Sequence, residues 1–204
     1  MANKKKSGPI LFLTGSLIVI AVMTFMLVFS NGDQTKRDRI KNYSVLNPEM
    51  DFTLKDQDGN DFHLKDHRGR LILLFFGYIS CPDICPVTLS KLSKAFHLLG
   101  NKADNVLTVF ISVDPERDTR EKLKEYLKYF KLNMVGLTGT KSEIDQVINA
   151  YKGYYAKVET NSAAGYLIDH SDLVYLIDKQ GRVVDLIHFD DESARVAQMI
   201  KENL

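Results

Sequence analysis

The chain has 204 residues, which is enough for one domain and a short additional segment but too few for two full-sized domains. Hydrophobic residues make up 45% of the sequence and charged residues 26%, as in globular proteins, so a mainly disordered chain is excluded. The 27 Lys and Arg against 26 Asp and Glu leave a formal net charge of +1, and without a basic excess nucleic acid is not expected as a partner. Two cysteines are too few for a disulfide scaffold or a four-thiolate zinc site, but they suffice for one pair that acts together.

Residues 10–29 form an apolar stretch without a charged residue. As a helix rising about 1.5 Å per residue, this stretch would be roughly 30 Å long, the thickness of the hydrocarbon core of a bilayer. Lys4, Lys5 and Lys6 in front of it would also suit a cleaved signal peptide, but the stretch is longer than a usual signal core and no small-x-small cleavage site follows it. We therefore predict a transmembrane helix at 10–29, preceded by a cytoplasmic tail at 1–9.

Basic residues lie on both sides of this predicted helix, so the positive-inside rule does not fix its orientation. A short tail before a signal-like helix is the usual arrangement for export, and we predict that the C-terminal part lies outside the cytoplasm. Because an Arg- and Ser-rich transit segment is missing, we favour a bacterial inner membrane with a periplasmic domain over a mitochondrial inner membrane. Residues 30–47 are polar and without periodicity, which predicts a linker, and residues 48–204 have the size of a single domain.

The first half of this domain has the pattern of a parallel βαβ unit. Two short apolar runs, 71–78 and 106–113, are typical of strands covered on both faces. Between them apolar residues recur at helical spacing, with Gly100 as the stop: Leu89, Leu92, Ala95, Phe96 and Leu99. Strand, helix and strand in this order predict parallel strands joined by a crossover helix.

Two further helices and a short strand follow. Asp118 and Thr119 are predicted to cap the first of these helices, and Ser142 the second. Between the two helices, residues 134–137 predict a short strand.

The remaining elements are hairpins and a last helix. Residues 52–64, with a turn at Asp58-Gly59-Asn60, and residues 173–187, with a turn after residue 177, have the alternation and turn residues of β-hairpins. A final helix is predicted at 192–203. A βαβ front half with a hairpin and a helix behind it indicates an α/β protein of the thioredoxin-like class, preceded by the transmembrane helix.

The two cysteines, Cys81 and Cys85, stand between the strand at 71–78 and the helix that follows it. In a parallel sheet, the carboxyl end of a central strand is where functional sites form. The positive end of the helix dipole favours thiolate over thiol, and Pro86 suits a first helical turn. The alternative is two buried cysteines that merely pack. Their position and the absence of any other cysteine favour a functional pair.

The spacing of the pair bears on its chemistry. Thioredoxin-type oxidoreductases have two residues between their cysteines, whereas three separate Cys81 from Cys85. The larger loop more easily admits a metal ion between the sulfurs. Two soft thiolates with one imidazole select Cu(I), whereas zinc ordinarily takes a fourth ligand.

The third ligand would come from one of five histidines. Four of them are expected to be surface or satisfied residues: His63, His67, His97 and His188. His170 stands immediately before the back hairpin, which approaches the cysteine loop in a thioredoxin-like fold. From position alone, His170 is as consistent with a ligand as with a structural residue.

Three sequence motifs resemble those of the Sco/SenC family, membrane-anchored copper proteins that assist assembly of cytochrome c oxidase. They are residues 76–86 (FGYISCPDICP), residues 112–119 (SVDPERDT) and residues 169–171 (DHS). The resemblance implies that Cys81, Cys85 and His170 bind a copper ion, Cu(I) or Cu(II). It further implies delivery of that copper to the binuclear centre in the copper-bearing subunit of the oxidase. Residues 151–167 could not be matched to the family pattern.

Asp114, in the second motif, is a candidate for supporting a copper ligand through a hydrogen bond. The alternative is that Asp114 begins a turn and Asp118 caps a helix, which would explain both residues without a metal.

Three other functions remain open at this stage. A membrane-anchored thiol-disulfide oxidoreductase would use the same cysteines on those of the oxidase and would not need His170. A peroxidase of related fold would need one cysteine as nucleophile. A purely structural membrane protein would need neither sulfur.

Overall fold

The computed structural model describes Met23, residues 51–160 and residues 165–204. The predicted tail, the transmembrane helix at 10–29 apart from Met23, and the linker at 30–47 lie outside the described residues. Among the helices that are described, none is both long and apolar enough to cross a bilayer.

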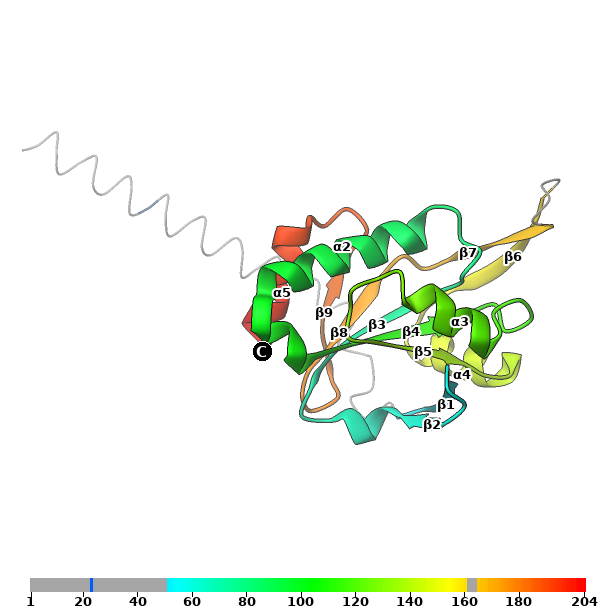
Figure 1. Cartoon of the computed structure of the whole chain (residues 1–204), viewed down its shortest axis with the longest axis horizontal. Helices are drawn as coiled ribbons and strands as arrows, with labels where there is room; N and C mark the ends of the chain where they lie inside the picture. Colours follow the sequence, from blue (N-terminus) through cyan, green and yellow to red (C-terminus); the bar gives the residue numbers. More distant parts are fainter. Residues whose placement is uncertain (1–22, 24–50, 161–164) are drawn as a thin grey trace, which may run out of the picture. The chain divides into compact units, whose positions relative to one another are not determined.

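The domain is built on a seven-stranded mixed sheet in the order β2-β1-β5-β4-β3-β8-β9 (Figure 1). Its strands are β1 (Thr53–Asp56), β2 (Asp61–His63), β3 (Leu71–Gly77), β4 (Val106–Ser112), β5 (Met134–Thr138), β8 (Val174–Ile177) and β9 (Val183–Ile187). Strand β4 pairs in parallel with both β3 and β5. Strands β8 and β9 form an antiparallel hairpin at one edge, and β1 and β2 form another at the opposite edge. The βαβ unit, both predicted hairpins and the thioredoxin-like class are confirmed.

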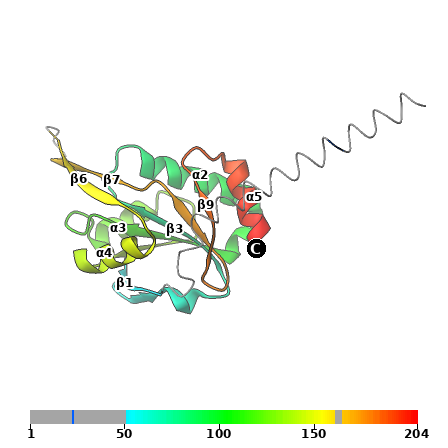
Figure 2. The ribbon, with the colours of Figure 1, turned by 180° about the vertical axis from the view of Figure 1, so that it is seen from behind.

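Helices cover both faces of the sheet (Figures 1 and 2). They are α2 (Ile84–Leu99), α3 (Arg120–Leu127), α4 (Lys141–Ala150) and α5 (Ser193–Asn203), with short 3₁₀ turns η1 (Leu64–His67) and η2 (Gly100–Asn105). Helices α2 and α5 pack together on one face, and α4 lies on the other. Helix α2 ends at Gly100, whose φ of 58° is a conformation that favours glycine.

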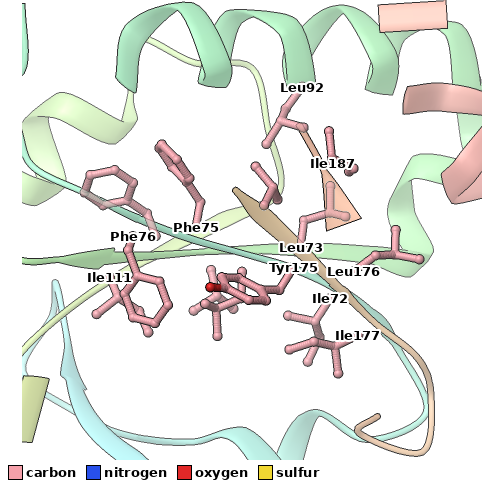
Figure 3. Packing of buried hydrophobic residues seen from close by; sticks show 14 of the residues in the cluster. Ile72, Leu73, Phe75, Phe76, Leu92, Ile111, Tyr175, Leu176, Ile177 and Ile187 are labelled. Carbon is pink, nitrogen blue, oxygen red and sulfur yellow. The ribbon is translucent and has the colours of Figure 1, made fainter. Parts of the chain in front are cut away.

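The core follows from the apolar runs of the sequence. Every residue of β3 and β4 is buried, as expected for central strands covered on both faces. Successive side chains point to opposite faces, so Phe75 and Phe76 enter different layers. Phe76 packs edge-on against Tyr151, just after α4, and against Tyr175 of β8. Figure 3 shows Leu92 directed from α2 toward the strands of the sheet.

Of the predicted helix caps, Thr119 is confirmed, whereas Asp118 and Ser142 are wrong. Helix α4 begins after Thr140 rather than Ser142, because Thr140 and Glu143 form a capping box in which each satisfies a backbone N–H of the other. Helix α3 is capped by Thr119, whose hydroxyl accepts a hydrogen bond from the Lys122 N–H. Asp118 does not cap this helix, because its carboxylate bonds to Ile79 and Ser112 instead.

The segment that matched no family pattern forms a separate hairpin. Strands β6 (Tyr155–Glu159) and β7 (Tyr166–His170) pair antiparallel with each other in a two-stranded sheet. This hairpin extends from one end of the domain (Figures 1 and 2). His170 is therefore the last residue of β7 and belongs to a strand that the sequence analysis did not predict.

Candidate metal centre

The two cysteines lie where strand β3 gives way to helix α2. Cys85 is in the first turn of α2 and has no exposed surface, whereas Cys81 lies in the preceding loop and is partly exposed. The Cys85 backbone N–H points at the sulfur of Cys81, with 3.4 Å between nitrogen and Sγ. The free N–H groups at the start of the helix thus face Cys81, as its position in the sequence indicated.

His170, at the end of strand β7, lies beside the two cysteines. Its Nε2 is 3.4 Å from the Sγ of Cys85, although 85 positions separate the two residues in sequence. The nitrogen and both sulfurs lie within 4.8 Å of one another. Among the described residues this is the one group of three or more His, Cys, Asp or Glu side chains with such spacing.

The orientation of the imidazole is fixed by its other nitrogen. Nδ1 lies 2.9 Å from the carbonyl oxygen of Ser171. Because a carbonyl only accepts hydrogen bonds, Nδ1 must carry the proton, which leaves the lone pair of a neutral ring on Nε2. This arrangement, a ring N–H held by a backbone carbonyl, is the usual support of a metal-binding histidine.

The two cysteines have opposite protonation tendencies. The hydrogen bond from the Cys85 side chain lowers the pKa of Cys81 to about 3, with further help from His170 and from the N–H groups of Cys85 and Asp83. The same contact with Cys81, together with burial, raises the pKa of Cys85. The metal-free site therefore holds a thiolate at Cys81 and a thiol at Cys85, whose S–H can donate to Cys81 or to His170.

The spacing of the three atoms fits one metal ion. Thiolate and imidazole ligands bind first-row metals at about 2.0–2.3 Å, so three ligands arranged around one ion lie about 3.5–4.0 Å apart. The three donor atoms, within 4.8 Å of one another, would need to approach by no more than about 1 Å. Two sulfurs and one nitrogen form a soft donor set, which suits Cu(I).

The other four histidines lie elsewhere. His67 stacks on Phe62, with 4.3 Å between ring centroids, and His63 bonds to Thr53. His97 is exposed near the end of α2, and the backbone N–H of His188 bonds to Asp191. Their contacts agree with the prediction that they are surface or satisfied residues.

The structure places Asp114 beside Arg117 and Tyr166. Its carboxylate, buried with 1% exposure, accepts hydrogen bonds from the Arg117 Nε and the Tyr166 hydroxyl. Its backbone oxygen accepts the N–H of Asp118 and so begins a turn, which confirms that part of the alternative reading, although Asp118 does not cap the helix. Asp114 is thus connected to the site indirectly. It binds Arg117, and the Arg117 guanidinium lies over the ring of Tyr78.

Tyr78 is a site residue that the sequence analysis missed. Its ring meets that of His170 edge to face, with 5.7 Å between centroids. Its hydroxyl accepts the backbone N–H of Ile168 at 3.2 Å, and burial and the nearby Cys81 raise its pKa. The phenol thus remains protonated and lies between strand β7 and the Cys81 sulfur. Its place inside the first motif was the available signal.

Asp118 holds the loop before Cys81 through hydrogen bonds. Its Oδ2 accepts the Ile79 N–H at 2.9 Å and the Ser112 hydroxyl at 2.7 Å. These bonds join the loop before Cys81 to the end of strand β4. Burial raises the pKa of Asp118 to about 6.

Comparison with known proteins extends these observations. The SCO1/SenC family model matches residues 23–204. An SCO2-like protein of Rickettsia prowazekii is 41% identical over 151 residues, which are 74% of this chain and 74% of that protein. Among solved structures, Bradyrhizobium japonicum ScoI with copper bound is 40% identical, with a TM-score of 0.70 over 76% of this chain and 98% of that chain.

A more distant structure is that of BsSco, described as a member of the Sco family of cytochrome c oxidase assembly proteins that has a disulfide switch. It is 25% identical, with a TM-score of 0.58, and the similarity covers 76% of this chain and 91% of that chain. The family match spans nearly the whole sequence and includes the cysteine loop and His170. The chain therefore belongs to the SCO1/SenC family.

Proposed function

We propose that this protein is a copper chaperone that binds one copper ion through Cys81, Cys85 and His170. Its acceptor is the binuclear copper centre of cytochrome c oxidase during assembly of that enzyme. The relatives support both parts, since one is a Sco protein with copper bound and another belongs to a family of oxidase assembly proteins. The predicted membrane helix would keep the domain at the membrane surface, in the bacterial inner membrane with the domain outside.

The observation that carries the proposal is the position of the His170 ring. Its Nε2 lies 3.4 Å from the Cys85 sulfur, and its Nδ1 is held by the Ser171 carbonyl. A redox pair makes no use of an imidazole in this orientation, whereas a soft metal ion can take it as a third donor beside the two sulfurs.

Transfer is consistent with the exposure of the site. Cys81 is partly exposed while Cys85 and His170 are buried, so an incoming thiolate can approach the copper from the Cys81 side. A carrier with three ligands leaves a coordination position for a donor from the acceptor. Copper binding requires reduced cysteines, so a disulfide between Cys81 and Cys85 would prevent loading.

The test is His170→Ala in the full, reduced chain, with His97→Ala as the matched control. Loss of a direct ligand should weaken Cu(I) binding by more than about a hundredfold, because loss of an outer-shell partner alone costs 10–100-fold. The exposed His97 lies at the far end of α2, and its substitution should leave affinity unchanged. Copper binding of His170→Ala that equals the parent would exclude this ligand set.

A second function, thiol-disulfide exchange on the cysteines of the oxidase, is favoured by one observation. The low pKa of Cys81 makes it a thiolate nucleophile beside a second thiol, as exchange requires. This activity should survive His170→Ala. A variant that loses copper but still reduces a disulfide substrate at the parent's rate would show that the two functions share the sulfurs and separate at the imidazole.

A further inference from the structure

The strand that carries His170 is not part of the main sheet. Within the described part of the chain, strand β7 pairs only with β6, whereas Cys81 and Cys85 follow β3, an inner strand of the seven-stranded sheet. Main-chain hydrogen bonding within that sheet therefore does not set the distance between the imidazole and the sulfurs. Other contacts must fix β7 against the body of the domain.

Four side chains, which we call the Arg117 cluster, make these contacts: Tyr78, Asp114, Arg117 and Tyr166. The Arg117 guanidinium lies over the Tyr166 ring at 3.6 Å and over the Tyr78 ring at 5.8 Å. Its Nη1 donates to the Tyr166 carbonyl oxygen at 2.9 Å, and its Nε donates to Asp114. Arg117 therefore connects the end of strand β4 with the first residue of β7.

Two further bonds hold β7 at its first and third residues. The Tyr166 hydroxyl donates to Asp114 at 2.7 Å, and the Ile168 N–H donates to the Tyr78 hydroxyl at 3.2 Å. His170 is two residues beyond Ile168 on the same strand, and its ring packs against Tyr78. The cluster thus contacts each of the three β7 residues that point to one face of the hairpin.

We propose that Asp114, Arg117 and Tyr166 are positioning residues that hold strand β7, and with it His170, at coordinating distance from the two sulfurs. The part of this proposal that is tested by copper affinity rests on the proposed function. The position of β7 can be tested in the metal-free protein. The role also accounts for the second sequence motif, which contributes no ligand of its own.

The burial of Asp114 and Tyr78 explains why the cluster can act as a fixed support. Asp114 is 1% exposed, and a guanidinium stacked between two rings keeps its charge and its planar donor geometry. Because Asp114 is buried, removing Arg117 would leave its charge without a compensating partner. The same hairpin also carries an exposed ion pair, Lys157 with Glu116, and exposed pairs contribute little.

The experiment compares three variants of the full chain. Arg117→Gln removes the stacked cation, Tyr166→Phe removes only the hydroxyl bond to Asp114, and Glu116→Gln breaks the exposed pair as the control. The milder Tyr166→Phe keeps the test decisive if Arg117→Gln does not fold. Each substitution is made in the parent and in His170→Ala, and the Cu(I) affinity is measured by competition with a chelator.

In the parent, Arg117→Gln should weaken Cu(I) binding by about 10–100-fold, as loss of an outer-shell partner does, and Tyr166→Phe by less. In His170→Ala neither should cause a further loss, because both act through the imidazole. In the Cu(II) form, nitrogen hyperfine coupling in the electron paramagnetic resonance spectrum should become weaker with Arg117→Gln than in the parent. Equal losses in both backgrounds, or no loss in the parent, would overturn the proposal.

Hydrogen exchange of the metal-free chain gives an independent measurement. The amides of Ile168 and His170 should exchange at least about tenfold faster in Arg117→Gln and at the parent's rate in Glu116→Gln. If His170→Ala leaves copper binding unchanged, the proposed ligand set is wrong. The hydrogen-exchange measurement then still tests whether the cluster holds strand β7 in position. Unchanged exchange in Arg117→Gln would refute that role whatever the copper results.

Discussion

Asp118 offers a test of the electrostatics beneath the cysteine loop. The carboxylate is 1% exposed, and its Oδ2 accepts hydrogen bonds from Ile79 and Ser112. Asp118→Asn keeps an oxygen that can accept both bonds and removes the charge. The variant therefore separates the cost of burying a charge from the loss of the loop contacts.

The magnitude follows from the pKa of Asp118, which burial raises from 3.8 to about 6. The folded protein thus binds this proton more tightly than the unfolded chain. The free energy of unfolding therefore falls as pH rises between about 4 and 6. A shift of about 2 units at about 1.4 kcal/mol per unit corresponds to about 3 kcal/mol. Asp118→Asn has no such group, so its stability advantage over the parent should grow by about 3 kcal/mol across this window and stay constant above it.

The assay is urea unfolding of the metal-free full chain at half-unit pH steps from 3.5 to 7.5. Because the sequence has no tryptophan, near-ultraviolet circular dichroism of the buried tyrosines is the suitable signal. Asp145→Asn is the control, since the hydrogen bond from Lys141 lowers the pKa of that carboxyl and its contribution changes below pH 4. A difference between Asp118→Asn and the parent that stays flat from pH 4 to 6.5 would refute the reasoning.

Two further outcomes follow from the site. A Cβ at Gly77 would lie 2.9 Å from the Cys85 sulfur, so Gly77→Ala should cost about 1–3 kcal/mol and also weaken Cu(I) binding. The matched Gly136→Ala, crowded to 2.7 Å by an aliphatic side chain, should lose stability alone, and equal copper affinities in the two would contradict this. Because the pKa of Cys81 is about 3, its alkylation by iodoacetamide in the reduced chain should be nearly independent of pH between 5 and 7. A rate that rises tenfold per pH unit, or modification of the buried Cys85 in the mass spectrum, would contradict this expectation.

The sequence was sufficient for the part of the fold whose pattern is unambiguous. Continuous apolar runs predicted β3 and β4, and their burial on both faces is confirmed. The position of Cys81 and Cys85 followed because a strand, a loop and a helix in this order bring the loop to the carboxyl end of the sheet. The metal-ligand assignment of His170 rested on the family resemblance, since its position alone left the alternatives open.

The hairpin β6–β7 escaped prediction for a physical reason. Most residues of β6 are exposed, and it carries Lys157 and Glu159, so it lacks the apolar periodicity that identifies a buried strand. It pairs with β7, and β7 is held by the Arg117 cluster through contacts between segments about 50 residues apart. Such contacts leave no local signal. The cap at Thr140 did leave one, since Glu143 at the third helical position completes a capping box that Ser142 cannot form.

The division of the site between two supports bears on how a carrier can release its cargo. Both sulfurs adjoin the central sheet, where movement would disturb a close-packed core, whereas His170 lies on a hairpin held by a few side-chain contacts. The ligand that can leave at the lowest cost is therefore the imidazole. Its departure would leave copper on two thiolates, a coordination that soft sulfur donors support for Cu(I), with a position open to an acceptor. We expect copper release to an external thiol to be faster in Tyr166→Phe than in the parent. A stopped-flow measurement that found equal rates would indicate instead that a cysteine leaves first.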